Sequence, residues 1–299
     1  MNVTGYSTGM VILCGVTAEG AVSGAKCLSS SETLGYEKTY GENFPGVTLE
    51  TLDSVDTVAG ATRTTSGYKN AVKDALNAFV IIGGGEVDLR TEEEILLDNL
   101  KEALPEGEGE FEKLFIAETL SVTKRAYKAK NGAGLVLETE EGFFGVGKNG
   151  ETENKAVEED AKLLINSSLT GVDIEPFELP SQILAVYKTG SGNYVFDLRA
   201  AGFGINGNNY YNPSGEYIKI KLSMTEEGKI ISAETIYQKE SEGYGSGCED
   251  KEFYEQFNGK TAEDYKNIDG ISGATITTNG YKTAIGKAFE ALEQLKGEK

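Results

Sequence analysis

A motif built on Gly-Ala-Thr occurs twice in this chain, and it constrains the fold more than any other feature. Residues 269–285 read Asp-Gly-Ile-Ser-Gly-Ala-Thr-Ile-Thr-Thr-Asn-Gly-Tyr-Lys-Thr-Ala-Ile, and residues 56–72 read Asp-Thr-Val-Ala-Gly-Ala-Thr-Arg-Thr-Thr-Ser-Gly-Tyr-Lys-Asn-Ala-Val. An Asp stands six residues before the motif threonine, which is Thr275 in one copy and Thr62 in the other. Chance rarely produces two copies of this length, so the chain contains an internal repeat. We expect its function to centre on these threonines.

A β-hairpin is predicted before each motif. In both copies an apolar strand, a Gly-containing turn and a second strand follow one another, over residues 10–28 and 216–237. This order is typical of a hairpin. A Glu-x-x-Gly-Tyr element then follows, at residues 32–36 in the first copy and 240–244 in the second. Because the elements keep the same order in both copies, we interpret them as two related modules.

A helix is predicted directly after each motif. Apolar residues recur at helical spacing from Tyr68 in the first copy and from Tyr281 in the second. The predicted N-caps of these helices are Thr64, Thr65, Thr277 and Thr278. Gly and Ala leave the main chain of the motif accessible, and a helix N-terminus attracts phosphate. The spacing therefore suggests a phosphate site, although simple capping of the helix would explain a single copy.

The length and the repeat predict two domains, residues 1–150 and 151–299. The second module is complete from about residue 170. The first has its motif half at residues 1–88, and its candidate opening hairpin, residues 119–145, comes later in the chain. Either this module is circularly permuted, or an earlier hairpin was lost and residues 119–145 belong to a further copy. We favour permutation, because an isolated motif half would expose unpaired sheet edges.

Composition excludes several classes of function. The net charge of −20 repels nucleic acid phosphates and anionic lipid surfaces, so no nucleic-acid partner is expected. The lack of histidine excludes His-based triads and His metal sites. The three cysteines match no metal spacing and are expected to be free thiols, with a Cys14–Cys27 pair as the alternative. No window approaches the ~20 apolar residues of a membrane span. The chain opens without a signal-peptide pattern, so we expect it to be a piece of something longer.

Three features together resemble the FMN-binding domain family. They are the Gly-Ala-Thr repeat, the Glu-x-x-Gly-Tyr-Gly element ending at Gly245, and the segment from Val-Tyr-Lys to Gly-Phe-Gly at residues 186–204. The family includes the peripheral subunits RnfG and NqrC of ion-pumping respiratory complexes and some cell-surface flavoproteins. The resemblance covers most of the second module and the motif half of the first. It implies an α+β protein with two FMN-binding domains, each a twisted antiparallel sheet packed with helices.

The resemblance also implies how the cofactor is attached. In such proteins a flavin transferase of the ApbE type, which uses FAD and Mg²⁺, joins FMN through its phosphate to the last Thr of Asp-x-x-Ser/Thr-Gly-Ala-Thr. The matching acceptors are Thr275 and, with less support because Ala59 departs from the pattern, Thr62. The matching recognition residues are Asp269, Ser272, Gly273 and Ala274 in the second module and Asp56, Gly60 and Ala61 in the first. No neighbouring His or Lys could activate the hydroxyl, so a separate transferase fits better than autocatalysis.

Further cofactor contacts are expected around the motif. The hydroxyls of Thr64, Thr65, Thr277 and Thr278 could add donors to the phosphate. Candidates to contact the flavin ring are the tyrosines Tyr36, Tyr68, Tyr244 and Tyr281, for which a place in the core is an equally good interpretation. Glu32 and Glu240 are weaker candidates, because such carboxylates are more often solvated or serve as caps. No catalytic residue and no metal site is predicted.

We therefore expect an electron carrier with two covalent FMN groups, in which the flavin supplies the redox chemistry. The resemblance implies an extracytoplasmic location, tethered to a membrane or a respiratory complex through a segment absent from this sequence. Its expected partners are the flavin transferase and redox proteins, among which a basic protein would dock by charge. A flavin-dependent reductase is a rival, but its substrate carboxylates would need clustered arginines, and the four here are spread out. A cell-surface binding module that keeps the fold without flavin is the other rival.

Overall fold

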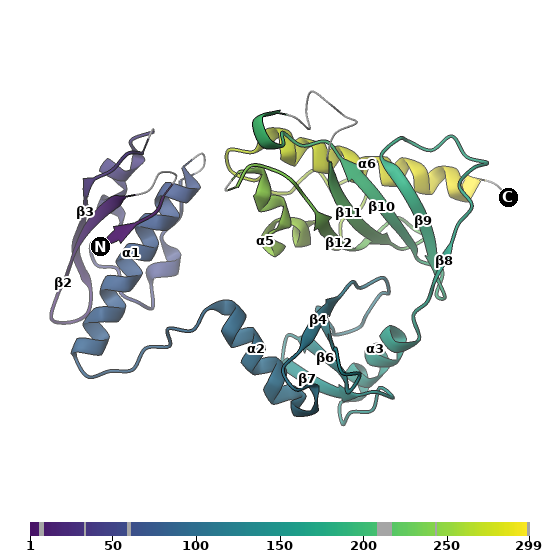
Figure 1. The fold of residues 1–299 in the computed structure, drawn as a ribbon, viewed down its shortest axis with the longest axis horizontal. Coiled ribbons are helices and arrows are strands. Elements are labelled where there is room, and N and C mark those ends of the chain that lie inside the picture. Colours follow the sequence, from purple (N-terminus) through teal and green to yellow (C-terminus); the bar gives the residue numbers. More distant parts are fainter. Residues whose placement is uncertain (6–8, 33, 59–60, 208–216, 243, 298–299) are drawn as a thin grey trace. The chain divides into compact units, whose positions relative to one another are not determined.

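The computed structural model describes residues 1–299 except 6–8, 33, 59–60, 208–216, 243 and 298–299, and it does not describe the side chains of residues 62, 63 and 206. The chain divides into two compact units, Met1–Leu89 and Arg90–Lys299 (Figure 1). This division differs from the predicted boundary at residue 150. Residues 90–168, which we call the middle segment, belong to the same unit as the second module.

The first unit is a small antiparallel sheet with a long helix packed on it. The sheet has the order β1-β2-β3, and the predicted hairpin at residues 10–28 is confirmed as β2 and β3. The elements are β1 (Asn2–Val3), β2 (Met10–Val16), β3 (Val22–Ser29), α1 (Thr62–Ile82) and the 3₁₀ helices η1 (Tyr36–Lys38), η2 (Tyr40–Asn43) and η3 (Leu52–Ser54). The inward residues of the hairpin, such as Met10 and Ile12, pack with Tyr68, Val72 and Leu76 of α1 into one core.

The second module contains a larger version of the same arrangement. Its sheet has the order β12-β11-β10-β9-β8, all antiparallel, and α6 (Thr275–Gly297) packs against β9 and β10 (Figure 1). The strands are β8 (Leu169–Gly171), β9 (Ile183–Thr189), β10 (Tyr194–Ala200), β11 (Ile218–Met224) and β12 (Ile230–Tyr237). The short helices are η5 (Ile205–Gly207), η6 (Gly245–Glu249), α5 (Lys251–Tyr254) and η7 (Glu255–Phe257). The predicted hairpin at residues 216–237 is confirmed in its described part as β11 and β12.

The middle segment builds a sheet of its own, with the order β4-β5-β6-β7. Its elements are α2 (Glu92–Ala103), η4 (Pro105–Gly107), β4 (Phe111–Leu114), β5 (Arg125–Ala129), β6 (Gly134–Thr139), β7 (Gly142–Gly147) and α3 (Lys155–Asn166). Successive residues of β6 enter two different cores, because strand side chains alternate between faces. Leu135 and Leu137 pack with Val157 of α3, whereas Val136 packs with Leu100 of α2.

The strand pairing of the middle sheet disagrees with the predicted circular permutation of the first module. Residues 119–145 contain β5, β6 and most of β7, and these strands pair with one another and with β4. In the first unit it is β1 that pairs with β2, through Val3 opposite Met10. The end of β10 pairs with β11 in the same way, through Ala200 opposite Ile218. The place beside β2 is therefore taken by β1, and residues 119–145 do not supply the opening hairpin of the first module.

Three aromatic rings form the same cluster in both modules. In the first, Phe44 stacks on Tyr68 with ring centres 5.6 Å apart, and Tyr40 meets Tyr68 edge-on at 5.6 Å. In the second, Phe257 stacks on Tyr281 at 5.4 Å, and Phe253 meets Tyr281 edge-on at 5.1 Å. Such pairs add to the stability that burial provides. The clusters fix the start of each motif helix against the segment that precedes the motif.

Candidate functional site

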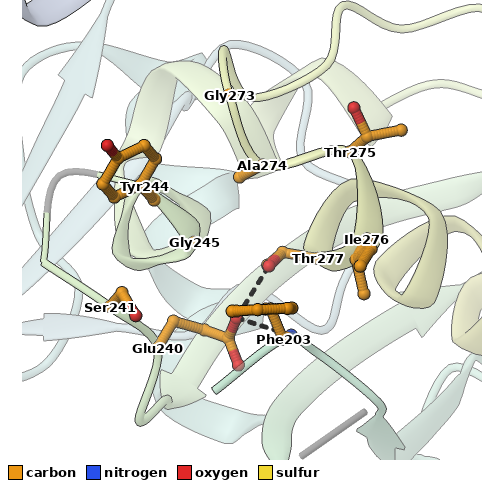
Figure 2. A pocket seen from close by; sticks show the side chains of 10 residues that line it. All are labelled: Phe203, Glu240, Ser241, Tyr244, Gly245, Gly273, Ala274, Thr275, Ile276 and Thr277. Carbon is orange, nitrogen blue, oxygen red and sulfur yellow. Dashed lines mark hydrogen bonds between the residues drawn. The ribbon is translucent and has the colours of Figure 1, made fainter. Parts of the chain in front are cut away.

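The second motif opens onto a cavity of about 400 Å³ at the N-terminus of α6 (Figure 2). Three stretches of the second module contribute to it: the loop after β10, the segment that follows β12, and the motif with the first turn of α6. The lining residues are Phe203, Glu240, Ser241, Tyr244, Gly245, Gly273, Ala274, Thr275, Ile276 and Thr277. Thr275 is the first residue of α6 and is exposed to solvent. The cavity therefore combines a reachable hydroxyl, a helix N-terminus, and apolar and aromatic walls.

The backbone of the motif has a form that only its small residues allow. Gly273 has a φ of +71°, in the left-handed region that favours glycine. A Cβ atom on Gly273 would lie 3.2 Å from the ring of Tyr244, which is closer than most contacts of such atoms. The Thr278 hydroxyl accepts a hydrogen bond of 3.0 Å from the Ile271 N–H and so closes the turn. Thr278 itself does not line the cavity.

Glu240 is the hydrogen-bonding centre of the site. Its side chain is buried, and it accepts bonds of 2.9 Å from the Phe203 N–H and 2.7 Å from the Thr277 hydroxyl (Figure 2). It also accepts a bond of 2.9 Å from the Gly204 N–H. These bonds join the loop after β10 to the first turn of α6. The site leaves no room for a larger residue at Gly245, where a Cβ atom would lie 2.4 Å from a Glu240 oxygen. The carboxylate thus shapes the cavity wall.

Two structural findings correct the predicted roles. The helices begin at the motif threonines, and the residue before α1 is Ala61, so Thr64, Thr65, Thr277 and Thr278 lie inside the first turn instead of capping it. Tyr68 and Tyr281 are fully buried in their cores, and Tyr281 is not among the cavity residues. The core interpretation therefore holds for these two tyrosines, because each forms the centre of an aromatic cluster.

The predicted residues of the second motif divide into two groups. Gly273, Ala274, Thr275, Thr277, Tyr244 and Glu240 meet at the cavity. Asp269 and Ser272 do not line it. The backbone N–H of Asp269 donates a hydrogen bond of 2.8 Å to the Gln256 side chain, and the Asp269 carboxylate is exposed. The exposed position of this carboxylate suits recognition by another protein more than contact with a ligand in the cavity.

Four cavity residues were missed as site residues: Phe203, Ser241, Gly245 and Ile276. The Gly-Phe-Gly pattern around Phe203 and the Gly after Tyr244 were visible in the sequence, but nothing local shows that the two segments meet. Their meeting depends on Glu240, which bridges residues distant along the chain.

The first motif repeats much of this geometry. The Thr64 hydroxyl donates to Glu32, as Thr277 does to Glu240, and the Val58 N–H donates a bond of 3.1 Å to the Thr65 hydroxyl. Tyr36 and Asp56 are exposed. Ala61 is buried just before α1. Gly60 and the side chain of the predicted acceptor Thr62 lie outside the described part of the chain.

In both modules a lysine of the motif helix donates hydrogen bonds to backbone carbonyls of the segment that precedes the motif. The Lys69 ammonium donates to the carbonyls of Asp53 and Val55 at 3.3 and 3.2 Å. The Lys282 ammonium donates to the carbonyls of Lys266 and Ile268 at 3.0 and 2.9 Å. These bonds fix the residues before each motif Asp to the first turns of the helix. The two modules thus share a frame of side-chain bonds as well as a sequence.

The modules differ beneath the motif helix. The Tyr281 hydroxyl is hydrogen-bonded to Thr235 at 3.1 Å, and burial raises its pKa. The Tyr68 hydroxyl is buried, has no partner among the described residues, and has a pKa raised by burial and by the Cys27 and Cys14 thiols. All three cysteines are free thiols, as the sequence predicts.

Among the described residues, no group of three or more Cys, Asp or Glu side chains could hold a metal ion. None of the helices that these residues form has the length and apolar character that a membrane crossing requires.

The chemistry of the cavity fits a phosphate ester that carries an aromatic ring. The N–H groups and dipole of a helix N-terminus favour a phosphate, and Thr275 stands at that position with its side chain exposed. The rings of Tyr244 and Phe203 and the Ile276 side chain offer the kind of wall on which a planar heterocycle packs. The lining residues include no arginine or lysine that could bind substrate carboxylates.

Comparison with known proteins gives two findings. The sequence model of the FMN-binding domain matches residues 5–77 and 214–290, which contain the two motifs. Over 94 residues the chain is 28% identical to one of the subunits of the proton-translocating ferredoxin:NAD⁺ oxidoreductase complex of Clostridium ljungdahlii. That match covers 28% of this chain and 51% of the relative, so it spans about half of the relative's length.

Proposed function

We propose, from the premise that this chain belongs to the FMN-binding domain family, that it is an electron carrier with FMN attached covalently to each of its two modules. The observation that carries the proposal is the exposed Thr275 at the N-terminus of α6, on the wall of the cavity. The similarity to a protein that belongs to a redox complex supports electron transfer as the role of the flavin.

Thr275 is the proposed acceptor in the second module. A flavin transferase of the ApbE type would join the Thr275 hydroxyl oxygen to the phosphorus of the FMN half of FAD, and AMP would leave with the proton of the hydroxyl taken up by solvent. The exposed hydroxyl and the exposed Asp269 carboxylate are both open to an approaching enzyme. Ser272, Gly273 and Ala274 form the tight turn that presents the threonine.

The residues of the cavity then bind and orient the attached group. Bound FMN would supply the electron chemistry, and the protein would set its position and environment. The N-terminus of α6 stabilises the negative phosphodiester. Tyr244 and Phe203 provide aromatic surface beside it, and the charge of Glu240 is offset by three hydrogen bonds. This arrangement excludes water from one side of the site while leaving the opening reachable by a partner.

Thr62 is the proposed second acceptor. It is the first residue of α1, as Thr275 is of α6. The shared frame of Glu32 with Thr64 and of Val58 with Thr65 supports an equivalent site. Two flavins in one chain would allow it to accept electrons at one module and release them at the other.

An extracytoplasmic carrier attached to a membrane redox complex is the proposed setting. Its support is the sequence resemblance together with the relative's membership of a proton-translocating complex. The net charge of −20 favours a basic redox partner. Electron transfer to such a partner should slow as ionic strength rises, because salt screens charge-guided encounter. A rate that does not change with salt would contradict docking by charge.

Peptide mapping after co-expression with a flavin transferase tests the attachment. We expect FMN adducts on peptides containing Thr275 and Thr62 in the wild-type chain. The variants Thr275→Val and Thr62→Val should each lose one adduct and keep the other. Adducts on other residues, or none with an active transferase, would contradict the covalent proposal. A chain that folds correctly but never takes up flavin would favour the binding module.

A further inference from the structure

We propose that Lys113 and Arg125 of the middle segment are positioning residues for the second flavin site. Through them, the flavin of the second module has a different environment from the flavin of the first. We call these two residues the bridging pair. The inference deepens the proposed function, because it concerns the environment of the flavin on Thr275.

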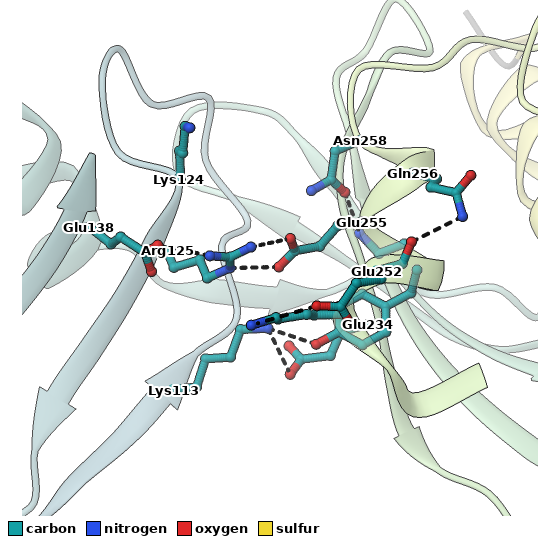
Figure 3. Close-up of polar contacts among 12 residues, drawn as sticks. Lys113, Lys124, Arg125, Glu138, Glu234, Glu252, Glu255, Gln256 and Asn258 are labelled. Atoms are coloured by element: carbon teal, nitrogen blue, oxygen red, sulfur yellow. Dashed lines mark hydrogen bonds and ion pairs between the residues drawn. The ribbon is translucent and has the colours of Figure 1, made fainter. Parts of the chain in front are cut away.

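Arg125 reaches from β5 of the middle sheet to η7 of the second module. It donates two hydrogen bonds to the two carboxylate oxygens of Glu255, one of them 2.8 Å long, and a third of 2.8 Å to Glu138 (Figure 3). All three side chains are largely buried, with exposed fractions of 18 to 26%. The bonds to Glu255 raise the Arg125 pKa. Two parallel bonds of this kind fix orientation as well as distance.

Lys113 makes a second connection, from β4. Its ammonium donates a hydrogen bond of 2.9 Å to the Tyr254 hydroxyl. It also lies 3.6 Å from the Glu234 carboxylate (Figure 3). Burial lowers the Lys113 pKa, but the bond to Tyr254 and the charge of Glu234 outweigh it and raise the pKa overall. The bridging pair thus contacts two consecutive residues, Tyr254 and Glu255, at the junction of α5 and η7.

The middle segment is itself fixed to the sheet of the second module. The carbonyl of Ile116 accepts bonds from the hydroxyls of Ser223 and Ser232, at 2.9 and 2.5 Å. The buried Glu118 carboxylate accepts a bond of 2.9 Å from the Asn193 side chain. These contacts hold the middle segment in place against the sheet of the second module. The bonds from the bridging pair therefore restrain the position of α5 and η7.

The held segment leads directly to the cavity. Gly245 lines the cavity and is the first residue of η6, which runs into α5. It lies so close to Glu240 and Thr277 that a Cβ atom there would be 2.4 and 2.6 Å from their oxygens. From the same segment, Phe253 and Phe257 pack on Tyr281 of α6. A shift of α5 and η7 would therefore move the cavity wall.

The first module has only part of this device: Glu42 stands where Glu255 does, but the tyrosine before it is replaced by Gly41 and the segment before the rings is shorter. Between the motif glutamate and the first ring of the aromatic cluster, the second module has residues 241–252 and the first only 33–39. When the two modules are aligned on their aromatic clusters, Tyr40 corresponds to Phe253 and Gly41 to Tyr254. The first module therefore has no counterpart of the Tyr254 hydroxyl that Lys113 binds. A Cβ atom on Gly41 would lie 2.2 Å from the Ala25 carbonyl oxygen, which leaves no room for a tyrosine.

Hydrogen exchange of the unloaded full-length chain tests the restraint without flavin. We expect Arg125→Ala and Lys113→Met to speed amide exchange in residues 245–257 by about tenfold, the effect of losing roughly one charged hydrogen bond. Residues 36–44 of the first module serve as an internal control. Lys124→Ala is the matched control variant, because Lys124 is next to Arg125 but pairs only with the exposed Glu140 among the described residues. If Arg125→Ala fails to fold, wild-type protein in 1 M salt should show the same local increase.

The flavin-loaded chain tests the consequence for the site. In a Thr62→Val background, Arg125→Ala should change the midpoint potential and the visible circular dichroism of the flavin on Thr275. Arg125→Lys should bring both values only part of the way back to those of the chain with Arg125, because lysine cannot form the two parallel bonds. In a Thr275→Val background, Arg125→Ala should leave the flavin on Thr62 unchanged. Equal exchange in Arg125→Ala and Lys124→Ala, or an unchanged potential, would overturn the inference. A chain that takes up no flavin would refute the proposed function, while the exchange experiment would still decide on the bridging pair.

Discussion

Replacing Glu240 with Gln tests the hydrogen-bonding centre of the candidate site. The glutamate is buried and accepts from two backbone N–H groups and the Thr277 hydroxyl. Gln has nearly the same shape but only one acceptor oxygen, and its NH₂ group would face donors. The substitution therefore removes charge and acceptors while leaving the packing almost unchanged.

The expected cost follows from those three bonds. Bonds to a charged acceptor are roughly twice as strong as neutral ones, and an unpaired buried donor costs about 1–3 kcal/mol. Two weakened bonds and one unpaired donor therefore give a loss of about 3 kcal/mol. For a unit of this size that loss corresponds to a fall of about 6–12 °C in the Tm of the second unit.

Calorimetry of the full chain, with hydrogen exchange to assign each transition, measures this loss. The transition that contains α6 should move to lower temperature, while the transition that contains α1 should stay in place. Glu226→Gln, at an exposed turn of the same module, is the control and should change little. A Glu240→Gln variant within about 0.5 kcal/mol of wild type would refute the assignment of Glu240 as the centre of the site.

Three further outcomes are expected. Tyr281→Phe should cost about 1 kcal/mol because it removes a bonded hydroxyl, whereas Tyr68→Phe should be neutral or stabilising, which denaturant unfolding can measure. Burial raises the pKa of the Cys248 thiol from 9.0 to about 12, so its contribution to stability is complete below pH 9 and is lost as pH rises through 12. Wild type should thus lose stability more steeply than Cys248→Ala over that range, by up to about 1.4 kcal/mol per pH unit, whereas equal slopes would contradict this. Asp160→Asn should destabilise the middle segment by about 2 kcal/mol in urea unfolding, because the carboxylate accepts from three consecutive N–H groups.

The repeated parts of the fold were predictable because their signals are local. Each hairpin has alternating strands around a Gly-containing turn, and each motif helix has apolar residues at helical spacing. The sequence pattern predicts the start of each motif helix too late, because threonines are common N-caps. Here the Thr278 hydroxyl accepts from the Ile271 N–H, and the Thr65 hydroxyl from the Val58 N–H. Those bonds close a turn that the sequence pattern does not reveal.

The strand pairing of the middle segment is harder to predict from the sequence, because its strands resemble those of the second module. The segment from residue 124 to 138 and the segment from 185 to 197 both have apolar strands around a Gly-containing turn. Which strands pair is decided by contacts between distant residues. In β6 both faces are buried, Leu135 against α3 and Val136 against α2, and such pairing cannot be read from the strand alone.

The candidate site is also only partly predictable from local sequence. The motif itself was evident from the repeat, and Thr275, Ala274, Gly273 and Tyr244 do meet at the cavity. The role of Tyr281 was open, because an aromatic residue at the start of a helix can face a ligand or the core. Packing of Phe253 and Phe257 on its ring places it in the core.

An anaerobic reductive titration of the chain carrying both flavins tests the central claim most directly. A two-flavin electron carrier should take up about four electrons per chain, and the Thr62→Val and Thr275→Val variants about two each, since one FMN accepts two electrons. The reduced chain should then pass its electrons to a soluble acceptor and return to the oxidised spectrum. A chain that carries FMN but takes up no electrons, or cannot release them, would contradict the account.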